Sequence, residues 1–181
     1  FKKKKIKSKK VISIYVRCLS NLKNWRQNNN LKNSYSKDRK RGGGVLLDLS
    51  HELDYMQWVF GKITKINFSQ VKKITNITND SEDYVNIQGN IGKINFVLNL
   101  NYFSKIEKRD ILIDGHDFNI YGDLINNKLT FLNKKNKISK KINIKKNNTY
   151  EIQANYFLKK IFKNFFSNKN GNNINKLIDR L

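Results

Sequence analysis

The sequence has no proline, one cysteine and one methionine among its 181 residues. A single thiol, Cys18, cannot form a disulfide within the chain, and this is typical of a reducing compartment, so we expect a cytoplasmic protein. No apolar run reaches the roughly 18 residues of a membrane span, so the sequence predicts no membrane partner. Two histidines and one cysteine match no zinc-ligand spacing, and we expect no metal site.

Acidic residues are also scarce: 14 of them stand against 37 lysines and arginines, which leaves a formal net charge of +23. Such a charge is typical of proteins that bind nucleic acid. However, lysine, asparagine and isoleucine are abundant together and basic residues are scattered along the chain, as an AT-rich genome would encode. Arginine, the better residue for reading phosphates and bases, is scarce beside lysine. Composition therefore disfavours a nucleic-acid partner.

Alternation of apolar and polar residues predicts strands over much of the chain. The expected strands are Val11–Arg17, Ile63–Ile74, Tyr84–Ile91, Lys93–Ser104, Arg109–Ile113, Phe118–Tyr121, Lys128–Leu132 and Ile138–Ile144. The expected helices run from the glycines at 42–44 to about Phe60, over Thr149–Phe165 and over Ile174–Leu181. This order predicts an α+β fold, a large and mainly antiparallel β-sheet with helices packed on one face.

The helix expected after the glycines carries two different faces at 100° per residue. An apolar stripe typical of a core-facing side consists of Leu46, Leu49, Leu53, Met56 and Phe60. A second face, typical of a pocket wall, consists of Asp48, His51, Tyr55 and Trp58.

A carboxylate three residues before a histidine can hold the ring, so that the free nitrogen accepts a proton from a substrate hydroxyl. Loss of that proton allows a carbinol carbon to release hydride to a nicotinamide. The preceding glycines would let a ligand approach the helix N-terminus. Taken alone, an Asp-x-x-His pair on a helix also fits a cap or a surface ion pair.

The run GGGVLLDLSHELDYMQWVFG, Gly42–Gly61, resembles the first helix of the C-terminal domain in the glucose–fructose oxidoreductase / inositol dehydrogenase / MocA (Gfo/Idh/MocA) family. Members carry there a glycine-rich turn, an aspartate, a histidine and a second aspartate. The flanks agree: VISIYVR looks like a family strand, and NWRQ and SYS look like its aromatic-basic loop. KRDILIDGHDFNIYGDL looks like the family's strand–turn–strand, and TYEIQANYFLKKIF looks like its closing helix.

The resemblance implies a nicotinamide-dependent oxidoreductase that acts on a sugar, a polyol or a nucleotide-linked sugar. It implies a dihydrodipicolinate-reductase-like C-terminal domain whose open sheet face usually joins subunits, so we expect an apolar open face and a homo-oligomer. By position, His51 would be the catalytic acid/base and Asp48 its partner. The substrate-binding residues that it suggests are Trp25, Arg26, Tyr35, Arg39, Asp54 and Tyr55.

Two features depart from the family pattern. The spacing from Asp48 to His51 is one residue shorter than in most members, whereas His51 and Asp54 keep the usual relation. The chain has no Gly-x-Gly-x-x-Gly after a strand and, without proline, no Glu-Lys-Pro motif. In the family both motifs belong to the N-terminal dinucleotide-binding domain. We therefore expect that such a domain binds NAD or NADP and that this chain has no cofactor-binding residue.

The sequence begins with Phe1 and a basic stretch that is typical of the end of a helix. We interpret residues 1–10 as the tail of a helix from a missing Rossmann domain, and residues 11–181 as the substrate-binding and oligomerisation domain. The leading interpretation is thus the substrate-binding half of an NAD(P)-dependent sugar or nucleotide-sugar oxidoreductase. The alternatives are a non-catalytic remnant or binding domain of the same fold, and a basic nucleic-acid-binding protein.

Overall fold

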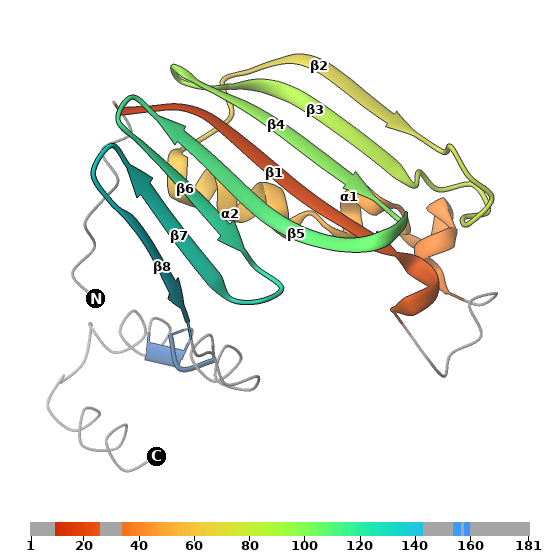
Figure 1. Cartoon of the computed structure of the whole chain (residues 1–181). Helices are drawn as coiled ribbons and strands as arrows, with labels where there is room; N and C mark the ends of the chain where they lie inside the picture. The colour runs from red at the N-terminus through yellow and green to blue at the C-terminus, as the bar shows by residue number, and fades with distance from the viewer. Residues whose placement is uncertain (1–9, 26–33, 143–153, 157, 160–181) are drawn as a thin grey trace, which may run out of the picture. The chain divides into compact units, whose positions relative to one another are not determined.

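The structure, a computed structural model, describes residues 10–25, 34–142, 154–156 and 158–159. Within these residues one eight-stranded sheet has the strand order β2-β3-β4-β1-β5-β6-β7-β8 (Figure 1). The strands are β1 Val11–Asn21, β2 Lys65–Lys72, β3 Tyr84–Ile91, β4 Ile94–Asn101, β5 Phe103–Gly115, β6 Phe118–Asp123, β7 Lys128–Asn133 and β8 Lys137–Lys141. The helical segments are η2 Leu22–Asn24, η4 Tyr35–Lys37, η5 Arg39–Arg41, α1 Val45–Asp48 and α2 His51–Phe60.

Both α-helices cover the same face of the sheet, and this confirms the predicted α+β class (Figure 1). β1 and β4 pair in parallel, and the other neighbouring strands are antiparallel. No helix of the described residues is long and apolar enough to cross a membrane. Residues 154–156 and 158–159, which are helical, belong to a second compact unit, 143–181.

The core lies between the helices and the central strands. In β1 the buried residues are Val11, Ile14, Val16 and Cys18. They change from odd-numbered to even-numbered positions after Val11, where the pairing of β1 with β5 has a bulge. Because side chains of a strand alternate between faces, the bulge lets both halves of β1 point apolar residues at the helices. The apolar stripe predicted for the helix is confirmed, since Leu49 and Met56 are buried and the other three members pack against the core.

The connection between β4 and β5 passes over the end of β1 at a single residue, Tyr102. The backbone of Tyr102 bridges three segments, because its N–H donates to Asp83 O at 3.0 Å and its carbonyl accepts from Leu22 N at 2.9 Å. The predicted strand Lys93–Ser104 is therefore divided here, and β5 begins earlier than the predicted Arg109. Residues 105–108 of β5 are all exposed, so no alternation marked them as strand.

The other strand predictions are confirmed within a few residues at their ends, except that residues 143–144 of the last predicted strand lie outside the described residues. The helix predicted from the glycines to Phe60 is instead two helices, which are separated at Leu49 and Ser50. The predicted helices Thr149–Phe165 and Ile174–Leu181 lie outside the described residues, apart from the five helical residues at 154–156 and 158–159. The helix tail predicted at residues 1–10 also lies outside them, apart from Lys10.

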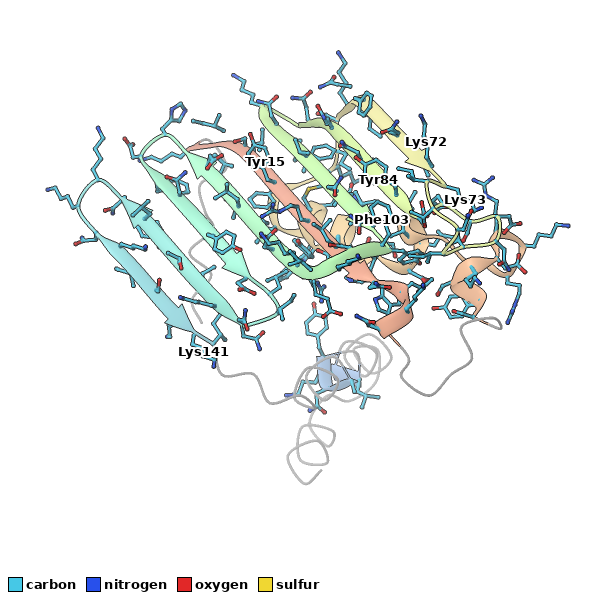
Figure 2. All side chains as sticks on the ribbon, turned by 45° about the vertical axis from the view of Figure 1, so that its right-hand side comes forward. Tyr15, Lys72, Lys73, Tyr84, Phe103 and Lys141 are labelled. Atoms are coloured by element: carbon cyan, nitrogen blue, oxygen red, sulfur yellow. The ribbon has the colours of Figure 1, made fainter. Side chains whose placement is uncertain are left out.

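The face of the sheet opposite α1 and α2 is mostly polar, and this corrects the apolar face that we expected. Register places on this polar face Ser13, Arg17, Asn86, Gln88, Asn95, Asn99, Asp110 and Asp114, with Tyr15, Val97 and Leu112 among them. Figure 2 shows Tyr15 and Tyr84 on this side of the ribbon. In the central strands the apolar residues of the alternating pattern thus point to the helix-covered face. The residues between them, many of which carry amides or charges, point to the other face.

Two charged clusters tie the polar face together. Arg17 donates to Asp110 through two nitrogens, Nε at 2.8 Å and Nη2 at 2.6 Å, and the Tyr121 hydroxyl donates to the same carboxylate at 3.0 Å. Asp114 accepts from Ser13 at 2.9 Å and from Asn119 at 2.6 Å. Hydrogen bonding to Asp110 is the main cause that raises the pKa of the Arg17 guanidinium. These pairs link β1, β5 and β6 across the middle of the sheet.

Candidate functional site

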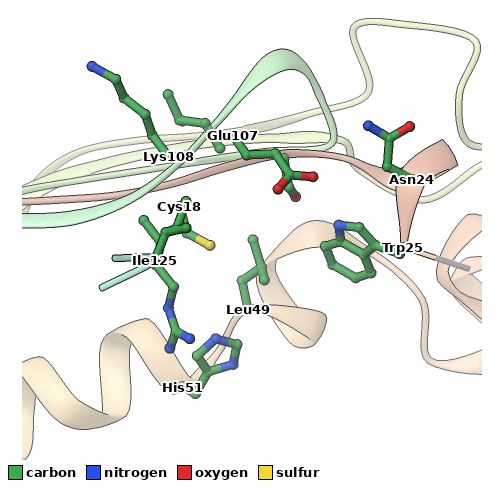
Figure 3. Close-up of a pocket in the computed structure, with 11 residues that line it drawn as sticks. Cys18, Asn24, Trp25, Leu49, His51, Glu107, Lys108 and Ile125 are labelled. Atoms are coloured by element: carbon green, nitrogen blue, oxygen red, sulfur yellow. The ribbon is translucent and has the colours of Figure 1, made fainter. Parts of the chain in front are cut away.

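A pocket of about 490 Å³ opens where the end of β1 meets the start of α2 (Figure 3). Its lining residues are Cys18, Leu19, Ser20, Asn24, Trp25, Leu49, His51, Glu107, Lys108, Arg109 and Ile125. Figure 3 shows His51 and Leu49 on the helix side, Cys18 on the sheet side and Lys108 pointing away from His51. The pocket therefore combines an aromatic wall with a histidine, as binding sites for small molecules commonly do.

His51 lies against a carboxylate that is wholly buried. Its Nε2 is 3.1 Å from Oε1 of Glu52, whose side chain is 0% exposed, while the His51 side chain is 48% exposed. The same Oε1 accepts a hydrogen bond from Nε of Arg109 on β5 at 2.6 Å. His51, Glu52 and Arg109 thus form one linked group with its carboxylate at the centre.

The Glu52 carboxylate also changes its neighbours. Burial first, and then the charge of Glu52, raises the pKa of the Cys18 thiol to about 12. The same two causes, in the same order, raise the pKa of the Tyr55 hydroxyl. Glu52 Oε2 and the Tyr55 hydroxyl are both buried, and hydrogen bonding between these two side chains is a further cause that raises the pKa of Tyr55. At neutral pH Cys18 and Tyr55 are therefore uncharged.

Asp48 has a different partner from the one that the sequence predicted. Its Oδ2 accepts a hydrogen bond at 2.5 Å from the Tyr102 hydroxyl, and among the described residues no ion pair joins it to His51. Burial, followed by this hydrogen bond, raises the pKa of Tyr102. The Trp25 ring packs edge-on against Tyr102, with centroids 5.2 Å apart and planes at 89°. Asp48 is therefore held beside the aromatic wall, and the break between α1 and α2 separates it from His51.

The glycine turn contacts the protein itself rather than leaving room for a ligand. A Cβ on Gly44 would lie 2.2 Å from Oε1 of Glu82, and a Cβ on Gly43 would lie 2.2 Å from the Tyr35 carbonyl oxygen. Oε1 of Glu82 also accepts from the N–H of Leu46, at the start of α1, at 3.2 Å. The helix start is thus already capped by a carboxylate of this chain, and the described residues offer no phosphate cradle here.

The remaining predicted site residues are dispersed. Trp25 lines the pocket, whereas Asp54 and Trp58 are exposed on α2, Trp58 at 79%. Arg39 is exposed in η5, where its backbone N–H donates to Asp80, and Tyr35 is 39% exposed in η4. The structure therefore brings His51 and Trp25 together in the pocket, with Asp48 bound to Tyr102 beside Trp25. The other predicted residues do not line it: Tyr35, Arg39, Asp54, Tyr55 and Trp58. Arg26 lies outside the described residues.

Sequence reasoning missed Glu52 and Arg109. One signal for Glu52 was available, because it stands one turn before Met56 and so falls near the apolar stripe, where an unpaired carboxylate is unfavourable. Arg109 had no local signal, since its partner lies 57 residues earlier in the chain. No cluster of three histidine, cysteine or acidic side chains in the described part of the chain could hold a metal ion.

In the described part of the chain the lysines and arginines are spread over the sheet, and only Lys108 and Arg109 of them line the pocket. Lysines lie at both ends of the sheet, with Lys72 and Lys73 at the β2 edge and Lys141 at the β8 edge (Figure 2). A nucleic-acid-binding surface would concentrate such residues on one face beside exposed aromatic rings. This distribution gives no support to the nucleic-acid alternative.

Residues 3–123 match the sequence profile described as "Oxidoreductase family, C-terminal alpha/beta domain". An NAD binding oxidoreductase from Klebsiella pneumoniae is similar in structure, with a TM-score of 0.60 and 16% identity over 72% of this chain and 39% of that chain. Levoglucosan dehydrogenase, solved with NADH and levoglucosan, has a TM-score of 0.61 and 14% identity over 74% of this chain and 40% of that chain. UDP-N-acetylglucosamine 3-dehydrogenase from Acidithiobacillus ferrooxidans has a TM-score of 0.59 and 16% identity over 80% of this chain and 43% of that chain. No curated protein sequence matches the chain.

The chain spans about two fifths of the length of these three solved structures. At such low identities the structural likeness shows the fold, and the sequence profile carries the assignment. The profile match covers more than half of the chain and includes β1 to β6, the two helices and every residue that lines the pocket except Ile125. The chain therefore belongs to the Gfo/Idh/MocA oxidoreductase family, of which it carries the C-terminal alpha/beta domain.

Proposed function

We propose that this chain is the substrate-binding half of an NAD(P)-dependent oxidoreductase that acts on a sugar or a nucleotide sugar in the cytoplasm. The observation that carries the proposal is His51, half exposed in a pocket and backed by the buried Glu52 carboxylate, on a domain of this family. Similar solved structures include levoglucosan dehydrogenase and UDP-N-acetylglucosamine 3-dehydrogenase, and this supports a sugar-type substrate.

In the proposed reaction the pocket binds and orients the sugar. Trp25 offers an aromatic surface for a ring, and Asn24 and Ser20 offer polar groups for its hydroxyls. His51 Nδ1, the nitrogen that does not face Glu52, takes the proton of the hydroxyl that is oxidised. In this proposal Asp48, which Tyr102 holds near Trp25, accepts a hydrogen bond from a second hydroxyl. The reverse reaction uses the same groups with His51 as acid.

The nicotinamide that accepts the hydride is bound by another part of the enzyme in this proposal. The glycine turn supports this, because Glu82 occupies the start of α1 and the turn packs on the chain itself. We propose that residues 1–10 lead from a Rossmann domain and that residues 11–181 form the substrate-binding and oligomerisation domain. In this proposal the subunits of a homo-oligomer contact one another through the polar face of the sheet.

The test is turnover by the protein joined to its dinucleotide-binding domain, with NAD⁺ or NADP⁺ and a panel of sugars and nucleotide sugars. His51→Ala should lower kcat/KM at least about 100-fold, since a positioned acid/base contributes roughly 10²–10⁴. His116→Ala, in an exposed turn, is the matched control and should keep wild-type turnover. Unchanged turnover in His51→Ala would contradict the assignment. Binding of a sugar without turnover would favour the non-catalytic alternative.

A further inference from the structure

We propose that Glu52, balanced by Arg109, is the positioning residue of His51 and takes the place that the sequence suggested for Asp48. The inference rests on the proposed function for its chemistry, whereas the contact itself is a property of this chain. It concerns a residue that lies behind the pocket wall, because Glu52 is 0% exposed and is not among the lining residues.

Stability alone gives a poor reason for a carboxylate at this position. A buried ion pair seldom stabilises a fold more than well-packed apolar residues would, because both charges lose their hydration. Glu52 stands among Cys18, Tyr55 and Met56, which are buried or mostly buried, and its side chain is 0% exposed, so its charge has lost its hydration. A cost of this kind is expected where the charge has a task at a neighbouring site.

The geometry suggests what that task is. One oxygen, Oε1, accepts a hydrogen bond from Arg109 Nε at 2.6 Å and lies 3.1 Å from His51 Nε2. In this proposal the arginine fixes the carboxylate, and the carboxylate orients the imidazole through its contact with Nε2. Nδ1, the nitrogen away from Glu52, is then the proton acceptor.

The proton balance of this arrangement is simple. As the substrate O–H bond breaks, its proton forms a bond with His51 Nδ1, while the hydride on the same carbon leaves to the oxidised nicotinamide. The imidazolium so formed keeps Nε2–H pointed at Glu52 Oε1, and the carboxylate compensates its charge. Asp48 does not perform this role, because its carboxylate contacts Tyr102 and no ion pair within the described chain joins it to His51.

The contact can be tested on the 181-residue chain without cofactor or substrate. The ring nitrogens of the two histidines give separate ¹⁵N signals, and each histidine is followed directly by an acidic residue, Glu52 or Asp117. Glu52→Gln should move the His51 signals and leave those of His116 in place. Asp117→Asn, the matched control in an exposed turn, should leave the His51 signals unchanged. Unmoved His51 signals in Glu52→Gln would overturn the inference.

Its consequence for catalysis is tested in the protein with its dinucleotide domain. Because Glu52 does not line the pocket, Glu52→Gln should lower kcat about tenfold or more and leave KM within about twofold. An unchanged kcat would overturn the inference. If the wild type turned over no sugar, the proposed function would fail, and the ¹⁵N signals would still decide the Glu52–His51 contact.

A second variant guards against simple unfolding. Glu52→Gln leaves the Arg109 charge without its partner, so the double variant Glu52→Gln/Arg109→Gln replaces the ion pair by two amides. The double variant should unfold at the wild-type temperature within a few degrees, yet keep the moved His51 signals and the lowered kcat. Wild-type signals and kcat in a folded double variant would show that the pair only supports the fold, and this would overturn the inference.

Discussion

Replacement of Gly44 by alanine should destabilise the chain far more than the same change two residues earlier. Gly44 has φ +124° and Gly42 has φ +79°, so both lie where side chains are rare. The left-handed conformation of Gly42 costs an alanine about 1–2 kcal/mol, and nothing lies within 4 Å of the added Cβ. Gly42→Ala therefore measures the backbone cost alone.

At Gly44 two further costs are added. Its backbone region is essentially restricted to glycine, at about 1–3 kcal/mol. The Cβ would also lie 2.2 Å from Oε1 of Glu82. That carboxylate must move, and it then loses its hydrogen bond to the N–H of Leu46, a cap contact of about 1 kcal/mol. We expect Gly44→Ala to lower the free energy of unfolding by about 3 kcal/mol.

The assay is urea unfolding of the 181-residue chain, followed by far-UV circular dichroism. In a Glu82→Ala background the clash and the cap are already gone, so Gly44→Ala should cost about 1 kcal/mol less than in the wild type. Equal losses for Gly44→Ala and Gly42→Ala would refute the contact between the glycine turn and Glu82.

Two other predictions concern charges in the sheet. The pKa of Cys18 is raised to about 12 from an ordinary 9.0, so the folded chain keeps a proton that the unfolded chain releases. The difference in unfolding free energy between the wild type and Cys18→Ala should be constant below pH 9 and should fall as pH rises towards 12; a flat difference would contradict burial of the thiol. Arg17→Met should lower the free energy of unfolding by roughly 2 kcal/mol, because Asp110 stays buried without its cation. The loss is smaller than for a fully buried pair, since the Arg17 side chain is half exposed to solvent. Lys140→Met on β8 is the control, and equal unfolding midpoints in urea would contradict this ion pair's contribution.

Local patterns were sufficient for most of the strands. The runs at β1, β3 and β4 alternate β-branched and aromatic residues against polar ones, and this pattern survives folding because one face of the sheet is covered. The apolar stripe of the helix could also be predicted from the sequence. Leu49 and Met56 are both buried in the core, although the predicted single helix is two helices.

The break between α1 and α2 could not be predicted from periodicity. It depends on Glu82 at the start of α1 and on Tyr102 at Asp48, which lie 36 and 54 residues further along the chain. The projection of one continuous helix therefore placed Asp48 beside His51 when the adjacent Glu52 is the partner. The same limit applies to the polar face, because which strand lies beside which is decided by pairing between distant segments.

The central position of β1 has a consequence for how the chain folds during synthesis. β1 is made before the other strands of this sheet, but its neighbours are β4 and β5, and Arg17 meets Asp110 93 residues later. Pairings between such distant segments form slowly, since a long loop must close before any contact repays its entropy. A ribosome adds about 5–20 residues each second. For several seconds the apolar side of β1 is therefore exposed without its neighbours, and the pocket at its end is among the last features to take shape.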